Sequence, residues 1–140
     1  MKSYEDIFRK ALYESFGFIQ KLGFSITEYG SCAFDCKNEH CIMEISLDLP
    51  PDIFVTIRPR EYLEPLKKYY PYHGIELAQI SSYYDPNYKH DFQTLKPEEI
   101  PQRMRLLSDL FKKHCTGILK GDFSDWPKIL DFVASKTKGE

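Results

Sequence analysis

The chain has 140 residues, the length of one ordinary domain, and its 42% hydrophobic and 29% charged residues are typical of a globular protein. A formal net charge of −2 gives no basic surface of the kind that binds a phosphate backbone, so we expect no nucleic acid partner. No apolar run approaches the roughly 20 residues that cross a bilayer, so we expect no membrane partner.

The first ten residues, MKSYEDIFRK, do not resemble a secretory signal peptide, because charged side chains interrupt the apolar run that such a peptide requires. We therefore expect a cytoplasmic protein. In that compartment the cysteines would be thiols, and the sequence contains Cys32, Cys36, Cys41 and Cys115.

A helix is predicted near the N-terminus. Ser3 and Asp6 resemble an N-cap with an acidic first turn, and Gly23 can end the helix. Between them apolar residues recur at helical spacing, at Ile7, Phe8, Ala11, Leu12, Phe16 and Ile19. From Phe24 the period changes to the alternation of a strand, which Gly30 and Ser31 interrupt.

The stretch from Cys32 to Pro59 predicts further antiparallel strands, because apolar and polar residues alternate along it. A four-residue hairpin loop at 37–40 would place Cys36 opposite Cys41 and Phe34 opposite Met43. After a turn at 49–52 the inward pattern repeats, and Pro59 ends the last strand. The residues expected to face the core are Cys36, Cys41, Met43, Ile45, Leu47, Ile53, Val55 and Ile57.

Prolines divide residues 60–96, where we expect two short helices at 63–70 and 76–84. Pro97 or Pro101 then opens a long helix with the stripe Ile100, Met104, Leu107, Phe111, Cys115 and Ile118, and a last helix carries Trp126, Ile129, Leu130 and Val133. The expected fold is a single α+β domain over residues 1–136, followed by a frayed tail at 137–140. In it, an antiparallel meander of about four strands packs against the N-terminal helix and two C-terminal helices.

The stretch CTGILKGDFSDWPKIL, residues 115–130, is interpreted as a corner between the last two helices. Gly121 can adopt the left-handed conformation after one helix, and Ser124 can cap the next. Asp122 and Asp125 suit a helix N-terminus and would repel a phosphate, so we expect neither an anion site nor a catalytic site here.

A second pattern, Cys32-x3-Cys36-x3-His40-Cys41, resembles a zinc site. The hairpin places His40 on the face opposite Cys36 and Cys41, so these cysteines are predicted to be core residues and no metal is expected. The other histidines lie in no recognisable nucleophile motif, and no GxSxG, HExxH or Walker signature is present. We expect no catalytic residue and no cofactor.

Seven of the ten tyrosines fall between Tyr62 and Tyr88. Tyrosine is enriched at binding hot spots, although these rings could instead cover one edge of the sheet. On the sheet face opposite the core, Ile42 and Phe54 stand among Asp35, Glu44, Thr56 and Arg58, so that face is either covered by a helix or offered to a partner. The predicted partner-binding residues are Tyr69, Tyr70, Tyr72, Tyr83, Tyr84, Ile42 and Phe54.

In element order the chain resembles small bacterial immunity proteins, and related uncharacterised proteins, encoded beside polymorphic toxins. The closing HCTGILKGDFSDWPKIL, residues 114–130, is similar to the ending LL-x-GD-x-S-x-W of some of them. The resemblance implies no catalysis, no cofactor and an inhibitory complex with a cognate toxin. It supplies no site residues, and the mild acidity of the chain leaves the toxin's activity open.

The expected function is therefore that of a non-catalytic protein-binding module, an immunity protein that inhibits a cognate toxin. Two alternatives remain. One is a secretion chaperone that presents a sheet face to an unfolded client, which an obligate dimer would favour. The other is a small-molecule-binding protein or enzyme with a pocket under the Tyr-rich segment, in which His73 or Cys36 would react. The oligomeric state is left open.

Overall fold

A computed structural model describes residues 3–30, 32–48, 51–60 and 74–138. The fold is α+β, as predicted. The described strands form one antiparallel sheet in the order β1-β2-β3-β4-β5, which is also their order in the chain, so the sheet is a meander. A short fifth strand adds to the four expected. The strands are β1 (Ser25–Glu28), β2 (Ala33–Lys37), β3 (Cys41–Asp48), β4 (Asp52–Pro59) and β5 (Ile75–Glu76).

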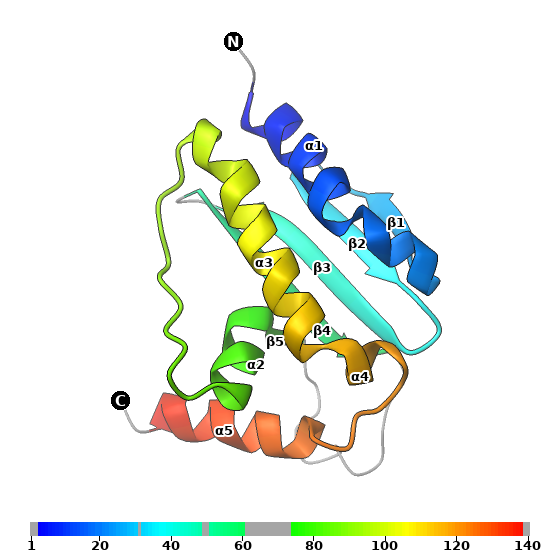
Figure 1. Cartoon of the computed structure of the whole chain (residues 1–140), viewed down its shortest axis with the longest axis vertical. Helices are drawn as coiled ribbons and strands as arrows, with labels where there is room; N and C mark the ends of the chain where they lie inside the picture. The colour runs from blue at the N-terminus through cyan, green and yellow to red at the C-terminus, as the bar shows by residue number, and fades with distance from the viewer. Residues whose placement is uncertain (1–2, 31, 49–50, 61–73, 139–140) are drawn as a thin grey trace.

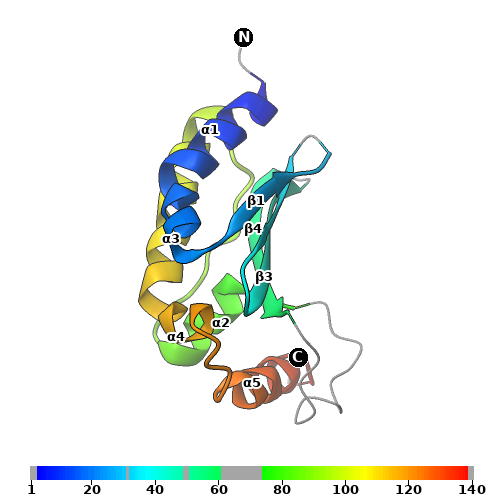
Figure 2. The same ribbon diagram turned by 90° about the vertical axis from the view of Figure 1, so that its right-hand side faces the viewer.

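The helices are α1 (Tyr4–Phe16), α2 (Leu77–Tyr84), α3 (Ile100–His114), α4 (Thr116–Leu119) and α5 (Trp126–Lys138). Figure 1 shows α1 and α3 side by side over the same face of the sheet, with α5 beyond the end of the strands. Figure 2 shows the sheet from its edge, with α1 and α3 on one side and no described helix over the other. The core therefore lies between the sheet and the α1–α3 pair.

The N-terminal helix begins where the sequence predicts. The Ser3 hydroxyl accepts a hydrogen bond from the Asp6 backbone N–H at 3.3 Å. The last part of the predicted helix, Gly17–Leu22, tightens into a 3₁₀ helix, and Gly23 ends it with φ of 86°. Its apolar stripe faces the core, where Phe8, Ala11, Leu12, Phe16 and Ile19 are buried.

The predicted register of the β2–β3 hairpin is wrong by two residues. Cys36 lies opposite Met43, and Phe34 lies opposite Ile45. The turn is tighter than expected because the Asn38 side-chain oxygen accepts hydrogen bonds from the backbone N–H groups of His40 and Cys41, both at 2.8 Å. A shift of two residues leaves every side chain on its predicted face, so the core assignment for this hairpin is correct.

The long helix predicted from Pro97 is divided. A 3₁₀ turn at Pro97–Glu99 precedes α3, which ends at His114, and the separate four-residue α4 follows. The predicted stripe is buried along its whole length, from Ile100 through Phe111 to Ile118. The apolar face of α5 is likewise buried at Trp126, Ile129 and Leu130.

Residues 120–125 form a corner, as predicted, with Gly121 at φ of 90°. Ser124 is not the N-cap that the sequence suggests, because α5 begins at Trp126 and the residue before it is Asp125. The Ser124 hydroxyl donates to the Asp122 carboxylate at 2.7 Å. The corner packs against the β2–β3 turn, where the Asn38 amide donates to the Leu119 carbonyl at 3.2 Å. A Cβ atom at Gly121 would lie 2.7 Å from Nδ1 of His40, so glycine is required for this approach.

In the middle segment, the predicted helix at 76–84 is present as α2, whereas the one at 63–70 lies outside the described residues. At the C-terminus α5 runs to Lys138, two residues beyond the predicted domain boundary. None of the helices in the described part of the chain combines the length and the apolar character needed to cross a bilayer.

Candidate functional site

The predicted partner-binding residues do not form one site. Tyr69, Tyr70 and Tyr72 lie outside the described residues. Tyr83 and Tyr84 are at the end of α2, next to α5 and the corner that precedes it. Ile42 and Phe54 lie on the sheet, on the face turned away from α1 and α3. The structure therefore offers two separate surfaces.

Tyr84 makes contacts within the molecule. Its hydroxyl donates to the Asp125 carboxylate at 3.0 Å, and its ring stacks on His114 with centroids 5.7 Å apart. Burial, followed by the hydrogen bond to Asp125, raises the pKa of Tyr84. The side chain thus connects α2 to the end of α3 and to the residue before α5, which gives Tyr84 a structural task.

The face of the sheet opposite the helices is called the open face. In antiparallel pairs, directly opposite residues point to the same side, so the register fixes its membership. Ile42 and Phe54, both partly exposed, are its large apolar side chains on β3 and β4. The open face consists of Ser25, Thr27, Ala33, Asp35, Lys37, Ile42, Glu44, Ser46, Asp48, Phe54, Thr56, Arg58 and Glu76. Asp52, opposite Asp48, is buried against Arg103.

Two aromatic residues that sequence reasoning missed extend the open face. Phe92, which is 56% exposed, stacks on Phe54 with ring centroids 6.0 Å apart. Tyr29 follows β1, and counting every second residue from Ser25 and Thr27 leads to Tyr29. The sequence could therefore have placed Tyr29 on the same face. Phe92 gave no such signal, because it lies in an irregular segment whose position only the fold determines.

The open face carries more acid than base. Four carboxylates, Asp35, Glu44, Asp48 and Glu76, lie there with two basic side chains, Lys37 and Arg58. Burial raises the pKa of Tyr29 to about 12, and a hydrogen bond to Glu44 and the charges of Asp35 and Asp48 act in the same direction. This face is not flat, because it has a hollow of about 260 Å³ lined by Asp35, Ile42, Glu44, Thr56 and Arg58.

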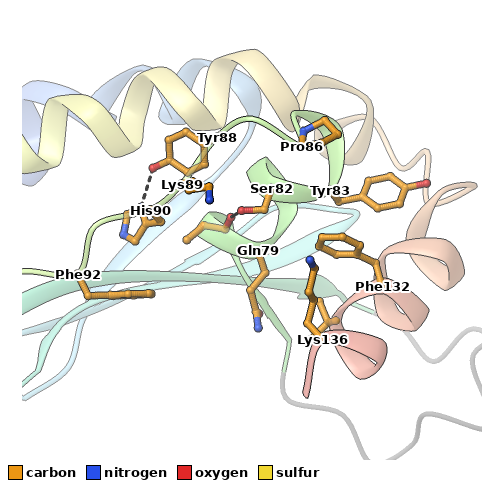
Figure 3. Close-up of a pocket in the computed structure, with 12 residues that line it drawn as sticks. Gln79, Ser82, Tyr83, Pro86, Tyr88, Lys89, His90, Phe92, Phe132 and Lys136 are labelled. Carbon is orange, nitrogen blue, oxygen red and sulfur yellow. Dashed lines mark hydrogen bonds between the residues drawn. The ribbon is translucent and has the colours of Figure 1, made fainter. Parts of the chain in front are cut away.

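The second surface is a pocket of about 640 Å³ between α2, the segment 86–92 and α5, called the α2–α5 pocket. Figure 3 shows its walls, with Tyr88, His90 and Phe92 from the loop, Gln79 and Ser82 from α2, and Phe132 and Lys136 from α5. Tyr83 packs edge-on against Phe132 at 5.7 Å. Volumes of this size are typical of small-molecule sites.

A buried ion pair holds the loop wall of this pocket. Arg103 donates from Nε and Nη2 to the two carboxylate oxygens of Asp52, each at 3.0 Å, and both side chains are at most 5% exposed. The same Nη2 contacts the Asp91 carbonyl at 2.8 Å and Nε2 of His90 at 3.0 Å. Nδ1 of His90 lies 2.6 Å from the Tyr88 hydroxyl oxygen.

These contacts fix the proton positions of His90. A guanidinium can only donate, so Nε2 of His90 must accept from Arg103, and its proton must be on Nδ1. Nδ1 therefore donates to the Tyr88 oxygen. Burial, and then the charge of Arg103, lowers the pKa of His90, which keeps the ring neutral.

Three of the four cysteines are core residues. Cys36, Cys41 and Cys115 are fully buried, and burial raises the pKa of each to about 12, so they are thiols at neutral pH. Cys36, one of the two groups named for the small-molecule alternative, does not line the α2–α5 pocket. His73, the other group named for that role, lies outside the described residues. Within the described ranges no three His, Cys, Asp or Glu side chains are placed to hold a metal ion.

Comparison with known protein families, with curated proteins and with solved structures finds no match to this chain. The two surfaces described above are therefore the basis on which a function can be assigned.

Proposed function

We propose that this chain is a non-catalytic, cytoplasmic protein-binding module, an immunity protein that binds and inhibits a cognate bacterial toxin through the open face of its sheet. The observation that carries the proposal is the apolar group on that face. Ile42, Phe54 and Phe92 are exposed or partly exposed there, with charged side chains around them. Ile42 and the Phe54–Phe92 pair lie on either side of the Glu44–Thr56 pair, so apolar side chains alternate with charged and polar ones, a mixture that protein interfaces commonly show.

The charge of the open face indicates which partner surface it fits. Asp35, Glu44 and Asp48 outnumber Lys37 and Arg58, and Lys37 already lies 3.3 Å from Asp35. Complementary potentials steer association and exclude wrong partners. The partner is therefore a folded protein whose surface is basic and also carries apolar side chains, and the resemblance in element order directs the proposal to a toxin.

The test is co-expression with the toxin-like product of the adjacent open reading frame, scored by rescue of growth and by the affinity of the purified complex. Glu44→Lys reverses an exposed charge in the middle of the open face and is expected to weaken binding at least tenfold. Glu14→Lys, on the exposed side of α1, makes the same charge change on the opposite layer and should bind as the unmodified chain does.

Two outcomes would overturn the proposal. No complex and no rescue with the neighbouring product would remove the immunity assignment. Equal affinities for the Glu44→Lys and Glu14→Lys variants would place the interface elsewhere. An obligate dimer that binds only an unfolded client would instead indicate a secretion chaperone, which light scattering and a folded-versus-denatured client comparison can detect.

A further inference from the structure

The α2–α5 pocket differs from the rest of the molecule in charge. Its lining contains two ammonium groups, Lys89 and Lys136, and among the described residues that form it none is Asp or Glu. The whole chain, by contrast, has 21 acidic and 19 basic residues. A pocket lined by two lysines and by no carboxylate, in a slightly acidic protein, is suited to an anion.

The neutral groups of the pocket also present donors. The side-chain oxygen of Gln79 accepts from the Glu76 backbone N–H at 3.1 Å, so the amide NH₂ is the end that Gln79 offers. Because Nδ1 of His90 donates to the Tyr88 oxygen, the Tyr88 hydroxyl keeps its own proton to give. Arg103, held by Asp52, thus fixes the tautomer of His90. That tautomer leaves the Tyr88 hydroxyl as a hydrogen-bond donor.

The walls are flat and aromatic. Phe132 faces the pocket from α5, and Tyr88, His90 and Phe92 line it from the loop (Figure 3). His90 meets Phe92 edge-on, with centroids 4.6 Å apart. Nζ of Lys136 lies 5.4 Å from the centroid of Phe132, so a cation and a ring face occur at the same wall. Such walls favour a planar ring over a branched aliphatic group.

We propose that the α2–α5 pocket binds a small molecule with a planar aromatic ring and a negatively charged group, the ring lying against Phe132 and the anion held by Lys89, Lys136 and the Tyr88 hydroxyl. Its volume of about 640 Å³ accommodates such a ligand. This site shares Phe92 with the open face, but its test does not depend on the proposed toxin partner.

The experiment is isothermal titration calorimetry of the full chain with three probes that differ in one property each. 2-Naphthoate carries the ring and the negative charge, 2-naphthylmethylammonium carries the ring with a positive charge, and decahydronaphthalene-2-carboxylate carries the charge without the aromatic ring. We expect saturable 1:1 binding of 2-naphthoate, with affinity at least tenfold above that of either other probe, and weaker binding as salt is added.

Variants locate the binding in the pocket. The double substitution Lys89→Gln and Lys136→Gln is expected to lower 2-naphthoate affinity at least tenfold. The matched control, Lys113→Gln and Lys120→Gln, removes two exposed lysines that do not line the pocket and should leave affinity unchanged. Tyr88→Phe should also weaken binding, and the unfolding midpoint of each variant shows that it remains folded.

The proposal is overturned if 2-naphthoate shows no saturable binding, if 2-naphthylmethylammonium binds equally well, or if the two lysine double variants have the same effect. None of these results would affect the toxin proposal, whose test uses Glu44 on the other surface.

Discussion

At the scale of single residues, the most consequential side chain is Arg103. Its guanidinium satisfies both oxygens of Asp52 and also contacts His90 and the Asp91 carbonyl. Asp52 in turn accepts from the Gln93 backbone N–H at 3.0 Å. One buried charge pair therefore joins α3, the start of β4 and the loop that forms the pocket wall.

Replacing Arg103 with Met should lower the free energy of unfolding by about 3–5 kcal/mol, because the Asp52 carboxylate would stay buried without its counter-charge. Urea denaturation measures this loss. Lys10→Met is the control, since it breaks an ion pair with Glu14 whose side chains are 69% and 61% exposed, and should cost no more than about 1 kcal/mol. Similar losses for the two variants would show that the buried pair has no special role. Adding Asp52→Asn to Arg103→Met should recover part of the stability.

His90 makes stability depend on pH in a defined direction. Its folded pKa is lowered by burial and by Arg103, against the opposing charges of Asp52 and Asp91, while the unfolded chain has the ordinary value of about 6.5. Below about pH 6.5 the unfolded state binds more protons at this histidine than the folded state does. The contribution of His90 to the free energy of unfolding is therefore fully present above about pH 6.5 and falls as the solution is acidified. His114, whose pKa is lowered by burial and by Lys113, acts in the same direction.

We expect the free energy of unfolding to rise between pH 5 and pH 7. The rise should be smaller in His90→Gln, whose amide can still accept from Arg103 and donate to Tyr88 but does not titrate. Urea titrations at several pH values measure the slope. An unchanged slope in His90→Gln would assign the pH dependence to other groups, and His114→Gln is the comparison that separates the two histidines.

At the scale of elements, the β2–β3 turn is held by one side chain. Asn38 is 6% exposed, and its amide accepts from two backbone N–H groups while donating to the Leu119 carbonyl before the corner. The turn therefore positions the hairpin against α4. This explains why the register differs from the predicted one, since a four-residue loop would leave Asn38 without these bonds.

Asn38→Ala should lower the free energy of unfolding by about 2–3 kcal/mol, because it leaves buried backbone donors and an acceptor without partners. Glu39→Ala, next to it in the turn and with a side chain that is 84% exposed, should change stability by less than about 0.5 kcal/mol. Thermal and urea unfolding of both variants test the difference. Equal stabilities would mean that water replaces the lost bonds and that the turn does not depend on Asn38.

The sequence predicts elements better than it predicts their contacts. Burial selects apolar residues at the period of a helix or a strand, so α1, β3, β4, α3 and the face of each were correctly predicted. The pair of Asp52 and Arg103 was not, because its members are 51 residues apart and no local pattern joins them. A signal existed, since Arg103 stands on the apolar stripe between Ile100 and Met104.

For the candidate surfaces too, the sequence predicts which face a side chain takes better than it predicts which distant residues meet. Alternation in β3 and β4 placed Ile42 and Phe54 on the correct face, because side-chain direction in a strand follows position alone. A pocket near the Tyr-rich segment was one of the alternatives, but its walls could not be foreseen, since they need α2, an irregular loop and α5 to meet. Tyr84 was assigned to a partner from composition, yet its hydroxyl bonds to Asp125 within the molecule.

At the scale of the whole molecule, the two proposed sites are adjacent. Phe92 lines the α2–α5 pocket and also stacks on Phe54 of the open face. A small ligand and a protein partner would therefore both contact Phe92. Binding at one surface can be measured with and without the other surface occupied, which shows whether the two proposed sites influence each other.

The order of the strands also sets the order of events during synthesis. The strands follow one another along the chain and can pair in that order as the chain leaves the ribosome, but α3, which covers part of the apolar side of the sheet, ends only at His114. At about 5–20 residues per second, the stretch from the end of β4 to the end of α3 takes on the order of 3–11 s. For that interval the nascent sheet exposes core residues such as Val55 and Ile57, and this is when the growing chain is most open to capture by chaperones or by another nascent copy.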